Sequence, residues 1–371
     1  MVASIPLVRV TGSHREVGRQ VGAATAGVVR RAVAFDAELP AGRTRDDQLA
    51  LARAYRAATL AATPWLVDEI DGAAEGVGVD PLALFAISVE EIWVVRPSQP
   101  GPPGSPGSGP PAPDPGRCSD IVAGPPLTAD GHLLVAHAND LAPDSEPAIV
   151  AVEWRVPGEP VVFSLGIGPW ISAGWNDAGL SLTGNELTPN DDRVGVPRLL
   201  MVREQLTART LDEAAAMALR PDRASSYNTL LAHREGGVLN VEGSATDAVV
   251  RRLGPAGGLA HTNHYVEPEM VRYEGDPEYA RRSAVRYGRA GALLAAAPPG
   301  SVTTALLRGW LADHEGAPDS ICRHPAPEPG GSTSKTVFWA VVDVTDGEVE
   351  YGLGNPCSGE PAERWSFAPR T

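Results

Sequence analysis

The sequence predicts an α+β protein in which two stacked β-sheets lie between layers of helices. Three observations lead to this prediction. Residues 1-96 show the 3.6-residue apolar period of amphipathic helices, and a stretch rich in proline and glycine follows at 97-117. Beyond it, short apolar or alternating segments typical of strands are grouped together around separate helical blocks, rather than alternating with single helices as in a doubly wound parallel sheet.

The N-terminal region carries the clearest helical signals. Ser13 and Glu16 have the spacing of a capping box, and Val17 and Val21 begin an apolar face behind it. The last helical segment is strongly apolar, which indicates a core position. We therefore predict an all-helical unit over 1-96, with helices at 13-35, 46-61, 64-76 and 80-95.

The second half of the chain changes to strand-like periods, with Asp-Gly and Ala-Gly turn signals between segments. Predicted strands lie at 119-123, 132-138, 148-156, 160-167, 170-174, 179-184, 228-233, 237-242, 247-253 and 258-262. Predicted helices lie at 197-208, 211-220, 278-297 and 302-314. A closing hairpin is expected from Thr336 to Asp343 and from Glu348 to Gly352, with its turn at Thr345-Asp346-Gly347.

Composition excludes several classes of function. The chain has 371 residues and a formal net charge of -15, so it lacks the basic face that a nucleic-acid partner requires. Cys118, Cys322 and Cys357 are too few and too widely spaced for a disulfide scaffold, and no Cys-x-x-Cys pair indicates zinc or redox chemistry. No apolar run approaches the roughly 18 residues of a membrane span. We expect no cofactor, no metal, no membrane partner and a cytoplasmic location.

Cys118 is the most informative single residue. It follows the proline- and glycine-rich stretch directly and opens the first predicted strand after it. An enzyme that cuts its own backbone between Arg117 and Cys118 would use the new N-terminal cysteine as nucleophile and the freed α-amine as base. The alternative interpretation of Cys118 is a small apolar residue that starts a strand.

Polar residues also end other apolar strands. Asp140 closes the strand after the turn at Asp130, and burying its carboxylate requires partners; the alternative is a turn or helix-cap aspartate. Asn263 ends a later strand, and its side-chain amide could donate to an oxyanion. The histidines beside it, His261 and His264, need a third ligand to bind metal.

Arg323 and several aromatic residues complete the candidates. Arg323 offers a permanent planar charge that could hold Asp140 or a substrate carboxylate, or could form an ordinary surface ion pair. Aromatic residues on strands are either pocket walls or core. The candidate substrate-binding residues are Trp170, Trp175, Asn185, His261 and Tyr265.

Taken in order, these clusters resemble the acyl-coenzyme A:6-aminopenicillanic acid acyltransferase family of N-terminal nucleophile hydrolases. The residues that carry the resemblance are Cys118-Ser119, Asp130-Gly131, His137-Ala138-Asn139-Asp140, Gly174-Trp175-Asn176-Asp177-Ala178-Gly179-Leu180, His261-Thr262-Asn263-His264, Ile321-Cys322-Arg323-His324-Pro325 and Gly354-Asn355-Pro356-Cys357.

The resemblance implies an αββα sandwich and self-cleavage before the nucleophile. It implies a helical propeptide-like region at 1-96, a linker at 97-117 and a catalytic domain at 118-371. By the same resemblance, Cys118 is the nucleophile, Asp140 orients its amine, Asn263 donates to the oxyanion, and Arg323 is the partner of Asp140.

The predicted function is that of an autoprocessing cysteine amide hydrolase or acyltransferase. It would act on amide or thioester bonds of a small acylated molecule through an acyl-enzyme on Cys118, with its own propeptide fragment as a partner. Two alternatives stay open. Arg117 and the long linker also suit a non-cleaving binding or structural protein, and an internal Cys118 could work with His137 or His261 as base.

Overall fold

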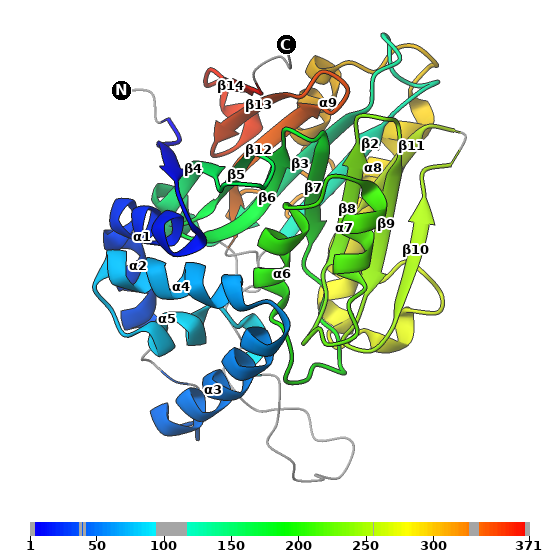
Figure 1. Ribbon diagram of the computed structural model, residues 1–371. Helices are drawn as coiled ribbons and strands as arrows, with labels where there is room; N and C mark the ends of the chain where they lie inside the picture. Colours follow the sequence, from blue (N-terminus) through cyan, green and yellow to red (C-terminus); the bar gives the residue numbers. More distant parts are fainter. Residues whose placement is uncertain are drawn as a thin grey trace.

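The computed structural model describes residues 4–36, 39, 42–93, 117–254, 256–325 and 334–367. The predicted linker lies outside this part of the chain except for Arg117, which is described through its backbone alone. Two sheets stack face to face and are covered by helices on both outer sides (Figure 1). The predicted fold class, a four-layer αββα sandwich, is confirmed.

The first sheet has eight strands, and its neighbouring strands are antiparallel except for the first pair, which is parallel. Its strands, in spatial order, are β1 (Leu7–Thr11), β4 (Ile149–Arg155), β5 (Val162–Ile167), β6 (Trp170–Asn176), β7 (Leu180–Asn185), β8 (Asn228–His233), β9 (Val238–Gly243) and β10 (Ala248–Arg252).

The second sheet has six antiparallel strands, and the site described below lies on its first three. Their spatial order is β11 (Gly258–His261), β2 (Arg117–Ala123), β3 (Leu134–Leu141), β12 (Lys335–Asp343), β13 (Glu348–Leu353) and β14 (Glu363–Ser366). The predicted hairpin is β12 and β13. The final strand, β14, was not predicted; it adds four residues to the sheet edge beside β13.

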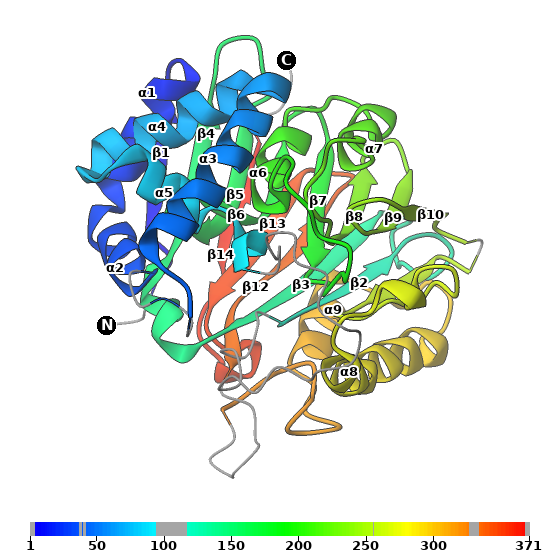
Figure 2. The ribbon, with the colours of Figure 1, turned by 90° about the horizontal axis from the view of Figure 1, so that it is seen from below.

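Helices cover the outer faces of both sheets (Figure 2). Val202 and Ala214 of α6 (Arg198–Gln205) and α7 (Leu211–Ala218) pack on the eight-stranded sheet. Ala290 and Leu307 of α8 (Pro277–Ala296) and α9 (Thr304–Leu311) pack on the six-stranded sheet. Between the sheets lies an apolar core that contains Phe163, Trp175 and Phe338. Burial of these large side chains is the main force that stacks the layers.

The N-terminal region is joined to the first sheet, and the prediction of an all-helical unit over 1-96 is wrong at its start. Leu7–Thr11 forms β1, which pairs in parallel with β4. The hydrogen bonds of β4 support this short segment, which has no helical period of its own. The helices that follow are α1 (His14–Ala24), α2 (Ala26–Asp36), α3 (Arg45–Ala62), α4 (Pro64–Val77) and α5 (Pro81–Ile87).

The local helix signals agree with the structure. Ser13 and Glu16 form the predicted capping box at the start of α1. The segment predicted over 80-95 ends as an α-helix at Ile87 and continues as a 3-10 turn. The 3-10 turns are η1 (Glu90–Trp93), η2 (Pro143–Ala148), η3 (Val271–Tyr273) and η4 (Pro356–Ser358). Within the described ranges, no helix is both long and apolar enough to cross a membrane.

Four glycines let α1 and α4 approach each other at backbone distance. A Cβ added at Gly18 would lie 2.0 Å from the carbonyl oxygen of Glu69, and one at Gly72 would lie 2.1 Å from that of Arg15. Gly22 and Gly76 have equally close backbone neighbours. The pair of helices therefore packs through two Gly-x-x-x-Gly faces, which leave no room for any side chain.

This packing predicts the effect of a single methyl group. Gly72→Ala should lower the free energy of unfolding by about 1–3 kcal/mol, because the backbone of Arg15 must move to admit the Cβ. The matched control is Gly288→Ala in α8, where an added Cβ meets nothing within 4 Å. It should raise stability by about 0.5–1 kcal/mol. Urea unfolding measures both, and equal effects would contradict the close approach of α1 and α4.

Candidate active site

Cys118 lies at the start of β2, between β11 and β3, where both of its reactive groups have polar partners. In the register of β2 with β3, Cys118 faces Asn139 and Arg117 faces Asp140. The side-chain nitrogen of Asn139 lies 3.4 Å from the Cys118 sulfur. The backbone nitrogen of Cys118 donates to Oδ1 of Asn263 at 2.9 Å. The sheet thus holds the nitrogen that cleavage would convert into an amine.

Asn263 is fixed in one orientation by its other hydrogen bonds. Its backbone N–H donates to the hydroxyl of Ser283 at 2.7 Å, and its Nδ2 donates to the carbonyl of Glu186 at 3.1 Å. Its Oδ1 also accepts from Nη2 of Arg286 at 2.9 Å. The amide therefore presents its oxygen to Cys118. The N–H groups expected to serve an oxyanion are on the other side, toward Glu186.

Arg286 is a residue of the site that sequence reasoning missed. It lies on α8, is fully buried, and brings Nη1 to 3.5 Å from the carbonyl oxygen of Cys118. The buried side of α8 contains Tyr279, Ser283, Arg286, Ala290 and Leu294. The sequence did offer one signal: an arginine stands among the apolar positions of the predicted helix. A buried guanidinium requires partners, so this position indicated a polar site beneath the helix.

Asp140 is fully buried beside the cysteine, and its carboxylate is held through a hydroxyl. Oδ1 accepts from the Thr336 hydroxyl at 2.7 Å, and that hydroxyl accepts from the backbone N–H of Arg323 at 3.0 Å. Burial raises the pKa of Asp140, while the charges of Arg286 and Arg323 lower it. Arg323 also forms an ion pair with Asp319. Thr336 thus links Asp140 to the backbone N–H of Arg323.

Burial and the surrounding carboxylates raise the pKa of the Cys118 thiol in the uncut chain. Burial raises the pKa of Cys118 well above its ordinary value, and the negative charges of Asp120, Asp140 and Glu186 raise it further. Arg286 is the cation that opposes this shift. The permanent positive charge of Arg286 on α8 therefore lowers the pKa of the Cys118 thiol against these larger effects.

A cavity of about 100 Å³ opens beside Cys118 between the strand ends and α6. Ile171, Leu182 and Val202 give it an apolar wall. The polar side chains of the lining are those of Glu90, Asn139, Ser172, Thr183, Glu186, Tyr227 and Thr229. Glu90 belongs to the N-terminal region, so this region supplies part of the cavity wall.

The structure places all five sequence-predicted substrate-binding residues outside this wall. The aromatic ones serve the core: Trp175 lies between the sheets, the Trp170 indole donates to the Ser88 hydroxyl at 2.8 Å, and the Tyr265 hydroxyl donates to the Gly243 carbonyl at 2.8 Å. These contacts favour the alternative interpretation, in which the three aromatics are core residues. Large side chains on central strands bury more surface between layers than at a cavity edge.

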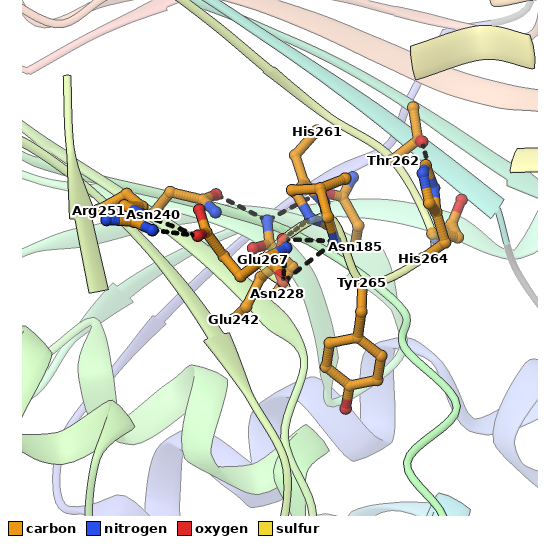
Figure 3. A network of polar contacts seen from close by, with 12 residues as sticks. Asn185, Asn228, Asn240, Glu242, Arg251, His261, Thr262, His264, Tyr265 and Glu267 are labelled. Carbon is orange, nitrogen blue, oxygen red and sulfur yellow. Dashed lines mark hydrogen bonds and ion pairs between the residues drawn. The ribbon is translucent and has the colours of Figure 1, made fainter. Parts of the chain in front are cut away.

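Asn185 and His261, the other two, belong to a buried polar network that joins the two sheets (Figure 3). The imidazole of His261 on β11 contacts Oδ1 of Asn185 through Nδ1 and Oε1 of Glu242 through Nε2, each at 2.9 Å. Nδ2 of Asn228 contacts Oδ1 of both Asn185 and Asn240. The network anchors the end of β11, two residues before Asn263.

Of the two histidines that an internal Cys118 would need as base, His261 has partners at both ring nitrogens, as above. His137 is buried, and its Nδ1 lies 2.8 Å from Oδ1 of Asp120. The Nε2 of His137 is buried and has no hydrogen-bond partner among the described residues.

Two groups of side chains among the described residues have the composition of a metal site. The first is Asp130, His132 and Asp343, and the second is His314, Cys322, His324 and Cys357 near Arg323.

Comparison with known proteins gives the following. The model of the acyl-coenzyme A:6-aminopenicillanic acid acyltransferase family matches residues 129–358. No curated protein sequence matches the chain. Among solved structures, a mutant conjugated bile acid hydrolase from Clostridium perfringens is similar with a TM-score of 0.44 and 12% identity, over 67% of this chain and 97% of that one.

Two further structures are similar to a comparable degree. An N-acylethanolamine-hydrolyzing acid amidase ortholog from Caenorhabditis elegans has a TM-score of 0.41 and 16% identity, over 62% of this chain and 93% of that one. A penicillin V acylase from Agrobacterium tumefaciens has a TM-score of 0.38 and 12% identity, over 64% of this chain and 83% of that one.

The charge of Arg286 predicts the reactivity of the thiol. Arg286→Gln should raise the pKa of Cys118 and slow its alkylation by iodoacetamide at pH 8 about tenfold, because a smaller fraction is thiolate. Timed labelling with mass spectrometry of the Cys118 peptide measures the rate. Arg281→Gln, an exposed position on the same helix, is the control and should leave it unchanged. An unaltered rate in Arg286→Gln would contradict this assignment.

Proposed function

Because the chain belongs to the acyl-coenzyme A:6-aminopenicillanic acid acyltransferase family, we propose that it matures by cleaving its own Arg117–Cys118 bond and then acts on small acylated amides or thioesters. The chain is an enzyme of the amide hydrolase and acyltransferase class with an N-terminal cysteine nucleophile. The observation that carries the proposal is that both reactive groups of Cys118 have an asparagine partner. Its backbone nitrogen is hydrogen-bonded to Asn263, and its sulfur lies beside the side-chain nitrogen of Asn139.

Self-cleavage requires an attack by the Cys118 side chain on the carbonyl of the preceding residue. The thiol loses its proton as its sulfur adds to the carbonyl carbon of Arg117, and the C–N bond breaks to give a thioester and a free amine that takes up that proton. Water then hydrolyses the thioester, which releases the carboxylate of Arg117 and regenerates the thiol. Asn263 supports both stages, because its oxygen accepts a hydrogen bond from the amide nitrogen before cleavage and from the amine afterwards.

Turnover uses the same groups on an external carbonyl. The free amine of Cys118 takes the thiol proton, the sulfur attacks the substrate carbonyl, and the amine returns a proton to the leaving group. Asp140 orients this amine, and Arg286 and Arg323 balance the buried carboxylate. Water as the second acceptor makes the reaction a hydrolysis, and an amine makes it an acyl transfer.

We assign the side-chain oxyanion donor to Asn139 and the acceptor for the amine to Asn263. The oxyanion of an intermediate bound to the Cys118 sulfur lies within reach of Nδ2 of Asn139, which is already 3.4 Å from that sulfur. Nδ2 of Asn263 is bonded to Glu186, and Arg286 favours the orientation in which its oxygen faces the cysteine.

The N-terminal fragment stays bound after cleavage and is the enzyme's own partner. Its strand β1 is part of the eight-stranded sheet, and Val10 and Val17 are buried in the core under α6. Glu90 accepts from the Tyr227 hydroxyl at 2.5 Å and pairs with Arg198 at 2.9 Å. Cleavage at residue 117 cuts the chain but breaks none of these contacts, so the domains proposed at 1-96 and 118-371 remain one particle.

The cavity suits a small apolar acyl group. Its apolar wall lies beside the Cys118 sulfur and disfavours a charged acyl group there. Glu90 and Glu186 also line the cavity, and Arg198 forms an ion pair with each of them. We therefore propose that the acyl chain contacts Ile171, Leu182 and Val202 and that the leaving group carries polar or cationic character.

Denaturing mass spectrometry tests the cleavage. The wild-type chain should give two fragments that end and begin at Arg117 and Cys118, and Cys118→Ala should stay intact. On a native sizing column the two wild-type fragments should elute together. An uncut wild-type chain with full amidase or acyltransferase activity would contradict self-cleavage and favour the internal-cysteine alternative. An uncut chain without activity would favour the non-cleaving binding protein.

Kinetics on the cleaved chain separate the roles of the two asparagines. Asn139→Ala should lower kcat about 10²- to 10³-fold with little change in KM, because its N–H serves the intermediate rather than the bound substrate. Asn190→Ala, an exposed asparagine, is the control and should keep wild-type kcat. A wild-type kcat in Asn139→Ala would return the oxyanion role to Asn263 or to backbone donors.

A further inference from the structure

Four metal-ligating side chains from three separate segments meet behind the strand that carries Thr336. They are His314 after α9, Cys322 and His324 before β12, and Cys357 in η4. One ligand atom from each lies within 4.8 Å of all the others. The Nε2 atoms of His314 and His324 are 3.2 Å apart, and Nε2 of His324 lies 3.6 Å from the Cys322 sulfur and 3.4 Å from the Cys357 sulfur.

These separations are those of a tetrahedral zinc site. Bonds of about 2.3 Å from zinc to sulfur and about 2.05 Å to nitrogen, at tetrahedral angles, place two nitrogens about 3.3 Å apart and a nitrogen and a sulfur about 3.5 Å apart. The observed distances fall within about 0.2 Å of these values. We propose that His314, Cys322, His324 and Cys357 bind one zinc ion in a closed, structural Cys₂His₂ site.

Hydrogen bonds alone account poorly for this cluster. Nε2 of His324 has three heteroatoms around it, yet a ring nitrogen carries either one hydrogen or one in-plane lone pair. The two histidine nitrogens also face each other, and at most one of them can donate in that contact. A cation at the centre satisfies the lone pairs of both nitrogens and both sulfurs together.

An outer partner supports the ligand set. Nδ2 of Asn355 donates to the Cys322 sulfur at 3.4 Å and to the carbonyl of Arg323 at 2.6 Å. A donor to a ligating sulfur is typical of metal sites, where it fixes the ligand and moderates its charge. Cys322 itself is buried, whereas His314, His324 and Cys357 are exposed, so the site has an open path for metal entry.

The ion would fix the segment that carries Arg323, since Cys322 and His324 are its two neighbours in sequence. The backbone N–H of Arg323 donates to Thr336, and Thr336 donates to Asp140. The metal thereby ties η4 and the end of α9 to the strand that positions Asp140. It acts as a positioning element, and it is independent of whether the Arg117–Cys118 bond is cleaved.

Metal analysis of the full-length chain, purified without chelators and then incubated with Zn²⁺ alone and desalted, tests the site. About one zinc per chain should remain bound. Cys357→Ser and His314→Ala, both at exposed positions, should each lose it while keeping the wild-type circular dichroism spectrum. Cys118→Ala and His132→Ala should retain it, because they lie in the catalytic site and in the second cluster of metal-ligating residues.

Two further measurements test the site by properties other than the zinc content of the chain. Co²⁺ in place of zinc should show the visible bands and sulfur-to-metal charge transfer of a tetrahedral thiolate site, and Cys357→Ser should abolish the charge-transfer band. Asn355→Ala should weaken zinc binding about 10- to 100-fold in competition with a coloured chelator.

Three outcomes would overturn the proposal. The first is a wild-type chain that binds no zinc although its thiols are free, and the second is a Cys322–Cys357 disulfide found in non-reduced peptides. The third is loss of zinc in His132→Ala with retention in Cys357→Ser, which would place the ion at Asp130, His132 and Asp343 instead.

Discussion

The pairing of β2 with β11 on one side and β3 on the other is the constraint on which the site depends. It brings Cys118 opposite Asn139 and puts Asp140 one register position further. On the other side, it pairs Asp120 with His261 at the end of β11, which places Asn263, two residues further, close to the Cys118 nitrogen. A slip of one residue would turn every one of these side chains to the opposite face of the sheet.

Buried charge is balanced around this pairing by arginines from outside it. Arg286 reaches in from α8 and Arg323 from the segment before β12, and both charges lower the pKa of Asp140. Arg286 also counters the acidic surroundings that raise the pKa of Cys118. Because a buried carboxylate without such partners is costly, the helical layer contributes to the electrostatics of the candidate site as well as to the core.

The N-terminal region is structurally part of the enzyme. Its first strand extends the eight-stranded sheet, its α1 and α4 pack through glycines, and its Glu90 reaches the cavity beside Cys118. Under the proposed cleavage, these contacts would keep the segment bound as a subunit rather than release it as a propeptide. The polar network around His261 also joins separate parts of the fold. It links the two sheets and fixes the end of the strand that precedes Asn263.

Much of this architecture was determined by the sequence alone. The change from helical to strand period, the capping box at Ser13, the order of the strands along the chain and the positions of Cys118, Asp140, Asn263 and Arg323 are local patterns, and local patterns depend on residues that are neighbours in sequence. Strand β1 was missed because its five residues become a strand only when β4 supplies hydrogen bonds.

Only the tertiary structure decided which atoms meet. It turned the oxygen of Asn263 toward Cys118, placed Arg286 in the site, packed Trp175 between the sheets, and gathered His314, Cys322, His324 and Cys357 from three segments. Each of these depends on contacts between residues far apart in the chain, and spacing along the sequence does not predict such contacts. The candidate residues could therefore be predicted from the sequence, whereas their partners and orientations were set by the packing of the layers.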